Sequence, residues 1–132
     1  MRGWSLSLKL SNNPGELAKL AKGLGEAGIN IEGFDAGAWQ TDAWVKVLVT
    51  DRDAAQQVIG KLGYTVDNAS EVVVETLPNK PGTLGEVAQR IADAGVNLTT
   101  AYMATDTRVA LGAENLDALE AAWRTYAGAA TH

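Results

Sequence analysis

The chain has 132 residues, of which 46% are hydrophobic and 20% charged, and its formal net charge at pH 7 is -5. This acidic balance argues against nucleic acid as a partner, because a protein that neutralises a phosphate backbone normally presents a basic face. The chain has no cysteine and its single histidine is His132, which excludes disulfides, zinc–thiolate sites, multi-histidine metal sites and a Ser-His-Asp triad in the core.

The N-terminal stretch predicts a strand. Residues 1–10 alternate apolar and polar side chains, whereas a signal peptide needs a continuous apolar core and a small-residue cleavage site. No apolar run in the sequence approaches the roughly 20 residues that cross a bilayer. We therefore expect no membrane association and a cytoplasmic location.

A helix start follows this strand. Asn13 stands before Pro14, Gly15 and Glu16, which predicts an Asn cap, a proline at the first helical position and a glutamate three residues after the cap. Gly28 can end the helix in the left-handed conformation. Apolar side chains between these limits recur at helical spacing and form one stripe: Leu17, Leu20, Ala21, Leu24 and Ala27.

Alternating and apolar segments then predict two strands, at 29–34 and 44–49. A short helix headed by Asp53 follows and closes at Gly63. Residues 64–66 predict a brief fourth strand.

An internal repeat is the strongest signal in the sequence. Residues 10–17 recur at 77–84, and Gly28-Ile29-Asn30 recurs as Gly95-Val96-Asn97, with both pairs of blocks offset by 67 positions. Further along, Asp53 matches Asn115 at an offset of 62, so the second copy is shorter. Two separated blocks in one register indicate a duplication.

The second copy predicts the same elements in the same order. Residues 72–77 form a strand, 81–94 a helix, and 96–104 and 108–112 two further strands, before a last helix that Asn115 caps. Residues 125–132 make a poor strand, so we expect the second repeat to lack a clear final strand.

These elements predict an α+β fold of two tandem ferredoxin-like βαββαβ repeats, over residues 1–69 and 70–132. Each repeat has an antiparallel sheet with its helices packed on one face. Without a final strand in the second repeat, the edge at 71–77 is unpaired, and an open edge invites another chain. The sequence therefore predicts a homodimer.

The duplicated Asn-x-Pro-Gly-x-Leu motif, followed each time by Gly-Ile/Val-Asn, resembles the ACT domain family. ACT domains are βαββαβ regulatory modules that commonly bind amino acids at the interface between two copies, so the resemblance implies a tandem ACT-domain protein. Residues 95–105 are similar to serine-sensing ACT modules. Such modules place a histidine two residues before the first Asn of the motif, where this chain has Leu10 and Leu77.

The resemblance also implies a ligand site. In this family the first loop and helix start contact the carboxylate and amino groups of the ligand, and the Asn that opens the second strand reaches it from a facing copy. Asn97 would face the first-repeat site and Asn30 the second. The corresponding residues of the two loops and helix starts are Asn12, Asn13, Gly15 and Leu17 in the first repeat and Asn79, Gly82 and Leu84 in the second.

Elementary chemistry is consistent with this site. A helix N-terminus stabilises a carboxylate through its unsatisfied N–H groups and partial positive charge. An Asn side chain offers a donor and an acceptor to a zwitterion. Asn12 and Asn79 have an alternative interpretation as residues that only shape the turn.

The leading hypothesis is a non-catalytic, allosteric regulatory protein that binds an amino acid between repeats or chains and acts on a separate regulated protein. It requires no cofactor, no metal and no catalytic residues. A small ferredoxin-like enzyme, such as an isomerase or cyclase using Tyr64, Tyr102 and aspartates, is one alternative. A purely structural oligomerisation module is another, because this architecture hosts many functions.

Overall fold

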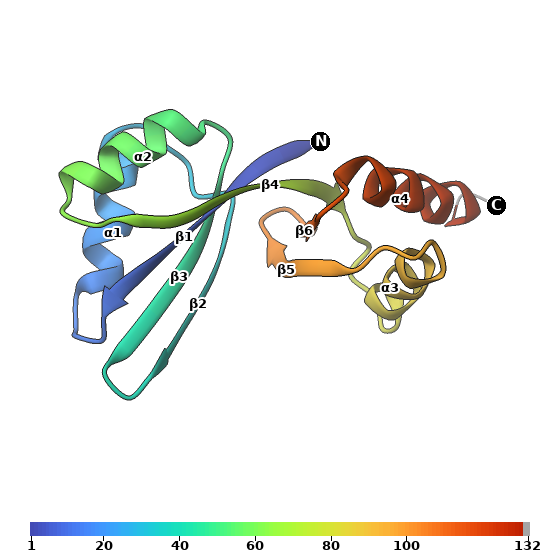
Figure 1. The fold of residues 1–132 in the computed structure, drawn as a ribbon, viewed down its shortest axis with the longest axis horizontal. Coiled ribbons are helices and arrows are strands. Elements are labelled where there is room, and N and C mark those ends of the chain that lie inside the picture. Colours follow the sequence, from blue (N-terminus) through green and yellow to red (C-terminus); the bar gives the residue numbers. More distant parts are fainter. Residues whose placement is uncertain (131–132) are drawn as a thin grey trace. The chain divides into compact units, whose positions relative to one another are not determined.

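A computed structural model describes residues 1–130 of the chain and shows an α+β fold of two compact units (Figure 1). The N-terminal unit comprises Arg2–Glu71, and the C-terminal unit comprises Met1 together with the chain from Val72 onward. Each unit has the strand-helix-strand-strand-helix order expected of a βαββαβ repeat. None of the helices within residues 1–130 is long and apolar enough to cross a membrane.

The N-terminal unit contains five complete elements, β1 (Arg2–Ser11), α1 (Glu16–Glu26), β2 (Gly33–Trp39), β3 (Asp42–Val49) and α2 (Arg52–Lys61), and the first part of β4 (Val66–Thr76). Strand β3 pairs antiparallel with β1 on one side and with β2 on the other. Strand β2 begins at Gly33, later than the expected 29–34, because residues 29–32 connect α1 to the sheet.

One face of this sheet is covered by α1 and α2. Alternate residues of β1 and β3 point to that face, and the helices bring the apolar stripe that their spacing predicted. The fully buried side chains of this core are Leu6, Leu8, Leu20, Leu24, Val45, Val47, Val49, Ala55 and Ile59.

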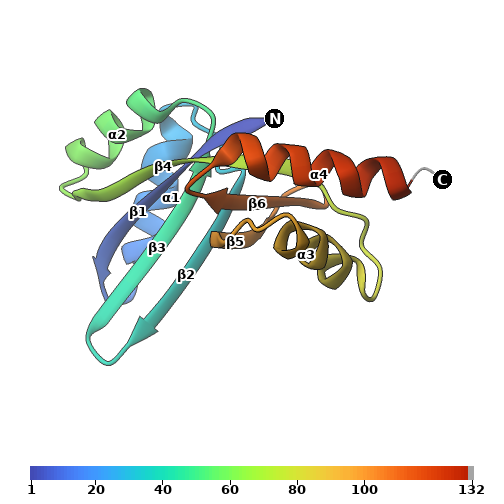
Figure 2. The ribbon, with the colours of Figure 1, turned by 45° about the vertical axis from the view of Figure 1, so that its right-hand side comes forward.

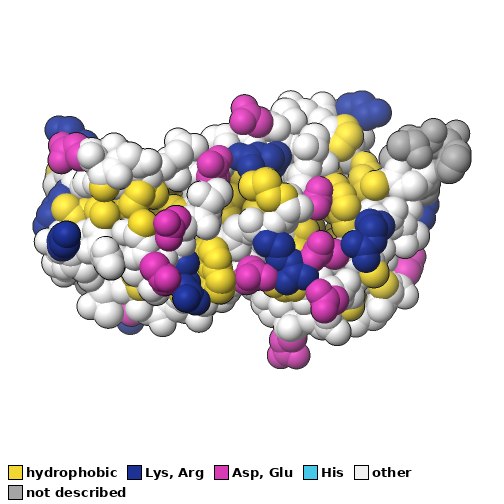
Figure 3. Space-filling model, turned by 90° about the horizontal axis from the view of Figure 1, so that it is seen from above, with side chains coloured by type: hydrophobic (Ala, Val, Ile, Leu, Met, Phe, Trp, Pro, Cys, Tyr) yellow, Lys and Arg dark blue, Asp and Glu magenta, His cyan; other side chains and the backbone are white. Residues whose placement is uncertain are grey.

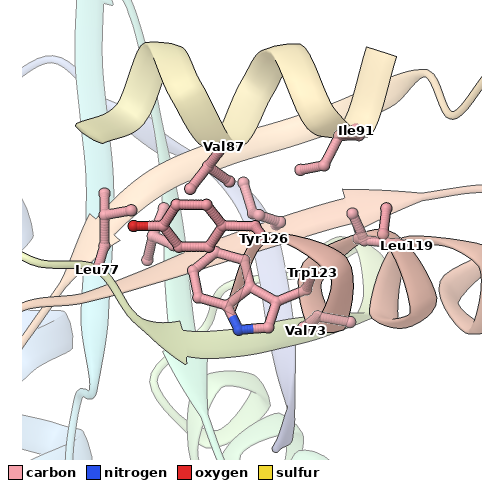
Figure 4. Close-up of a cluster of buried hydrophobic side chains, with 10 residues drawn as sticks. Val73, Leu77, Val87, Ile91, Leu119, Trp123 and Tyr126 are labelled. Atoms are coloured by element: carbon pink, nitrogen blue, oxygen red, sulfur yellow. The ribbon is translucent and has the colours of Figure 1, made fainter. Parts of the chain in front are cut away.

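The C-terminal unit is built from the rest of β4, then α3 (Thr83–Asp93), β5 (Leu98–Ala104), β6 (Arg108–Ala113) and α4 (Leu116–Ala130) (Figure 2). Strand β6 pairs antiparallel with β4 and with β5. Helices α3 and α4 close the core, and Figure 4 shows Val87 and Ile91 of α3 above Trp123 and Tyr126 of α4.

The expectation that the second repeat lacks a final strand is wrong. Residues 125–130, expected to be a poor strand, belong to α4. The strand position beside β4 is instead filled from the start of the chain, where the carbonyl of Met1 accepts a 2.9 Å hydrogen bond from the N–H of Val74. The residues after the last helix carry no sign of this contact, because it comes from the other end of the chain.

The predicted open edge is therefore occupied. Strand β4 pairs with β6 on one side, and Met1 contacts it on the other through Val74 and through an ion pair to Glu75 at 2.9 Å. The argument for a homodimer from an unpaired edge at 71–77 falls with this finding.

Candidate functional site

Both repeats begin their first helix on a glycine in the left-handed conformation. Gly15 has φ 92° before α1 and Gly82 has φ 88° before α3, and neither helix has a side-chain cap within the described residues. The expected Asn13 cap with Pro14 as first helical residue is therefore wrong. Only glycine adopts this backbone conformation at little cost, so the chain turns at Gly15 and Gly82 and the helices begin one residue later.

The first turns of α1 and α3 therefore have no side-chain acceptor, although the N–H groups of Glu16 and Thr83 donate to the carbonyls of Asn13 and Lys80 at 3.4 and 3.3 Å. An N-cap side chain would accept a hydrogen bond from one of the free N–H groups, and glycine has none. The partial positive charge of each helix start therefore faces outward.

The first loop, residues 12–15, is fastened to its own unit. The Asn12 Nδ2 donates to the carbonyl of Gln40 in the β2–β3 turn at 2.7 Å, and the N–H of Asn13 donates to the carbonyl of Ser11 at 2.9 Å. Leu17, on the first turn of α1, is 42% exposed. The Asn12 side chain therefore ties the first loop to the β2–β3 turn.

Charged side chains also lie at the start of α1. The hydroxyl of Tyr64 donates to Glu16 Oε2 at 2.6 Å, and the ammonium of Lys19 lies 5.0 Å from the centre of the Tyr64 ring. Burial, then the hydrogen bond and the charge of Glu16, raise the pKa of Tyr64 from 10.0 to about 12. Glu16 therefore places a carboxylate of the protein at the positive end of α1.

The shifted tyrosine predicts a loss of stability in alkali. Since the folded pKa of about 12 exceeds the unfolded value of 10.0, the neutral hydroxyl stabilises the fold fully below pH 10.0, and this contribution is lost as the pH rises toward 12. Urea unfolding across this range should show a steeper loss of stability for the wild type than for Tyr64→Phe. Parallel curves for the two proteins would contradict the assigned hydrogen bond.

The second loop, residues 79–82, borders a cleft of about 680 Å³. Gly82 lines it with the basic Lys80, while Thr83 and Glu86 of α3 and Tyr126 of α4 complete the polar lining. Of the other residues predicted for this site, Asn79 is exposed and Leu84 is 51% exposed. The second loop and the start of α3 thus lie at the edge of a cleft.

The two asparagines that were expected to open the second strand of each repeat occupy equivalent places, although Asn30 lies three residues before β2 and Asn97 directly before β5. Asn30 and Asn97 are both exposed and follow Gly28 and Gly95, each with φ 75°. Asn97 also lines a pocket of about 310 Å³ beside the start of α4, where Asn115 Oδ1 accepts a 3.0 Å hydrogen bond from the N–H of Ala118. That Asn97 and Asn30 reach a ligand held by a facing copy stays a prediction.

The caps of the two later helices differ from each other. Asn115 caps α4 as predicted, but α2 begins two residues earlier than a cap at Asp53 requires. Asp51 Oδ1 accepts from the N–H of Ala54 at 3.1 Å, and Asp53 lies in the first turn of the helix. Acidic groups near Thr50 therefore serve the helix, and no cluster of three metal-ligating side chains occurs within residues 1–130.

Sequence reasoning missed Lys80, Glu86 and Tyr126. The repeat does not point to Tyr126, because the helix caps Asp51 and Asn115 align at an offset of 64, which places Tyr126 opposite Leu62, an apolar position that packs on the core of the first repeat. On the face shown in Figure 3, acidic and basic side chains are intermixed.

Comparisons with known proteins agree with this architecture. Residues 70–121 match the ACT domain family, whereas no curated protein sequence matches the chain. Protein BT0572 from Bacteroides thetaiotaomicron has a similar structure, with a TM-score of 0.81 and 24% identity over 96% of this chain and 89% of that one.

Two further similar structures come from aspartate kinases. The ligand-free regulatory subunit from Thermus thermophilus has a TM-score of 0.71 at 17% identity, over 93% of this chain and 88% of that one. The aspartate kinase of Clostridium acetobutylicum has a TM-score of 0.61 at 14% identity, and the match covers 92% of this chain but 32% of the kinase. At these identities the likeness is one of fold.

The family resemblance read from the repeated motifs is therefore confirmed: the chain carries an ACT domain over residues 70–121, in a tandem fold like that of an aspartate kinase regulatory subunit.

Proposed function

We propose that the chain is a non-catalytic regulatory module that senses a free amino acid at the helix starts marked by the repeated Asn-x-Pro-Gly motif. The ligand residues would be those of the two loops, namely Asn12, Asn13, Gly15 and Leu17 and their counterparts Asn79, Gly82 and Leu84. Asn97 and Asn30 would close the sites from a facing copy, contributed by the other repeat or by a second chain.

One observation carries this proposal. Both loops present an uncapped helix start behind a left-handed glycine, with φ 92° at Gly15 and 88° at Gly82. A carboxylate is stabilised at such a place by the N–H groups and the helix dipole, without a cation of full charge. The absence of a side chain on glycine also lets a ligand approach the backbone closely.

The ACT match and the fold support a regulatory role. The similar structures from Thermus thermophilus and Clostridium acetobutylicum are those of a regulatory subunit and of an allosteric enzyme. A ligand at 100 times its Kd stabilises the bound state by about 2.7 kcal/mol. Allosteric coupling is typically about 1–3 kcal/mol, so binding of this strength suffices to shift the state of a separate regulated protein.

A thermal shift screen against the twenty proteinogenic amino acids tests the proposal. We expect one or a few of them to raise the melting temperature of the wild type by several degrees, since about 2.7 kcal/mol at saturation moves a domain of this size that far. Asn30→Ala and Asn97→Ala should each reduce the shift, because each removes a donor and an acceptor from a ligand site.

Asn68→Ala is the matched control. Its side chain donates only to the hydroxyl of Ser70 on the surface of β4, at 2.6 Å, so the ligand shift should persist in this variant. No shift with any amino acid would leave a structural oligomerisation module as the better reading. Turnover of an added substrate would favour the enzyme.

A further inference from the structure

Two tryptophans lie on the face of the N-terminal sheet that points away from α1 and α2. The strand register places Trp44 of β3 between Lys9 of β1 and Gly37 of β2. Because alternate residues of a strand share a face, Asp35 and Trp39 lie on the same side as Gly37. The exposed fractions are 73% for Trp39 and 45% for Trp44. We call the surface formed by Lys9, Asp35, Trp39 and Trp44 the tryptophan face.

The hairpin that carries the tryptophan face holds it in place. A Cβ atom added at Gly37 would lie 2.4 Å from Trp44 Cζ2, so the indole rests directly on the backbone of this glycine. The hydrogen bond of 2.7 Å from Asn12 to the carbonyl of Gln40 fastens the turn, which lies at one tip of the N-terminal unit (Figures 1 and 2). The Trp44 ring therefore loses little conformational freedom when another surface covers it.

The second repeat forms a shorter hairpin that has no such face. The helix caps that follow the two hairpins align at an offset of 64, and the repeated motifs before them align at 67. These offsets place Ala104 and Arg108, which pair across β5 and β6, opposite Gly37 and Trp44. Arg108 Nε donates to the carbonyl of Thr105 at 2.9 Å. The fold of a repeat therefore does not require an indole at this place.

The charges of the tryptophan face make it complementary to itself. Lys9 lies on the β1 side of Trp44 and Asp35 on the β2 side, and both are exposed. A two-fold axis parallel to β3 would lay β1 of each copy over β2 of the other, with Trp44 against Trp44. Lys9 would then lie over Gly37 of the other copy. Asp35 and Trp39, on either side of that glycine, offer its ammonium a carboxylate and an aromatic ring.

The area of this surface suits a weak dimer. A buried aromatic side chain covers about 150–250 Å², so the exposed parts of Trp39 and Trp44 from two copies supply about 500 Å². The charged side chains around them extend the contact toward the roughly 1,200 Å² at which specific interfaces begin. Tryptophan is also enriched at the centres of such interfaces.

We propose that the tryptophan face is an interface between two copies of this chain related by a two-fold axis. Trp44 packs on its counterpart at the centre, and Lys9 of each copy is held between Asp35 and Trp39 of the other. The contact is made by a sheet face and needs no unpaired strand edge. The inference is independent of the proposed amino-acid sensing, because none of these four residues is a proposed ligand residue.

Sedimentation velocity of the full chain from about 1 to 100 μM tests this interface. We expect the wild type to pass from monomer to dimer across the range. Trp39→Ala should weaken dimerisation by about 10-fold or more, as is usual for a tryptophan in an interface. Phe34→Ala is the matched control and should dimerise like the wild type. Phe34 is 55% exposed on the same strand, but it pairs with Val47 and so points to the helix side.

Charge reversal tests the contact between the copies directly. Lys9→Asp and Asp35→Lys should each weaken self-association, because each brings like charges together twice in a two-fold dimer. A one-to-one mixture of the two variants should restore the dimer, since every reversed side chain then meets an opposite charge on the other protein. Circular dichroism on each variant establishes that it is folded before sedimentation.

Several results would overturn the proposal. A chain that stays monomeric at about 100 μM would assign the tryptophan face to a different protein. A dimer that persists unchanged in Trp39→Ala, or one that Phe34→Ala weakens while Trp39→Ala does not, would place the contact elsewhere. A mixture of the charge variants that associates no better than either variant alone would refute the pairing of Lys9 with Asp35.

Discussion

Replacing Ile91 by alanine is expected to lower the free energy of unfolding by about 2–5 kcal/mol. Ile91 is 1% exposed and packs in the core of the C-terminal unit, where Figure 4 shows it facing α4. Alanine would remove buried methylene and methyl groups and leave a cavity, because a close-packed interior relaxes only partly. Urea unfolding followed by circular dichroism measures the change.

Leu84→Ala is the control on the same helix. Leu84 is 51% exposed, so its truncation removes little buried area and should change stability by less than about 0.5 kcal/mol. Because Leu84 is also a predicted ligand contact, this variant separates a role in binding from a role in folding. Equal destabilisation by the two substitutions would show that α3 does not pack as described.

A second large effect is expected at Gly112, one residue before the end of β6. A Cβ atom added there would lie 2.9 Å from Thr100 Cγ2 and 3.2 Å from Thr99 Oγ1, both closer than ordinary van der Waals contact. Gly112→Ala should therefore destabilise the protein by about 1–3 kcal/mol, the usual cost of overpacking. Thermal unfolding of the variant beside the wild type measures this cost.

Gly85→Ala provides the opposite result in the same unit. A Cβ at this position in α3 has no described atom within 4 Å beyond its own helix and chain neighbours. Alanine is favoured over glycine in a helix by about 0.5–1 kcal/mol, so the melting temperature should rise. A loss of stability at Gly85 comparable with that at Gly112 would contradict the packing argument.

The sequence predicted the cores well, because burial imposes a regular spacing on apolar residues. Leu20 and Leu24 of α1 are fully buried, as their helical spacing required. The apolar alternation of β1 likewise places Leu6 and Leu8 against the helices. The duplication strengthened both predictions, because the same helix and strand patterns occur in both repeats.

Helix starts and strand limits were predicted less well. Asn13 and Pro14 satisfy the composition rules for a helix start, yet the structure places the N-cap at Gly15. Glycine adopts the left-handed conformation at little cost, so the chain turns there without a capping side chain. The strands expected at 64–66 and 72–77 are one continuous strand, β4. Its exposed polar residues, including Asp67 and Asn68, resembled a loop because an exposed strand has no apolar alternation to mark it.

The candidate site was predicted in part. Spacing and motif identified the two loops, but the cleft beside Gly82 depends on Tyr126, which lies far from the loop in sequence and reaches it through the packing of α4. Periodicity describes one element at a time and carries no information on which helix end meets which loop.

Strand β4 has a consequence for the evolutionary history of the chain. Its residues up to Glu71 belong to one unit and those from Val72 to the other, and Met1 joins the second unit from the opposite terminus. A recombination break between the duplicated halves would sever a shared strand and separate Val74 from its partner. We therefore expect the two repeats to be inherited together, and gene fusions to contain both of them.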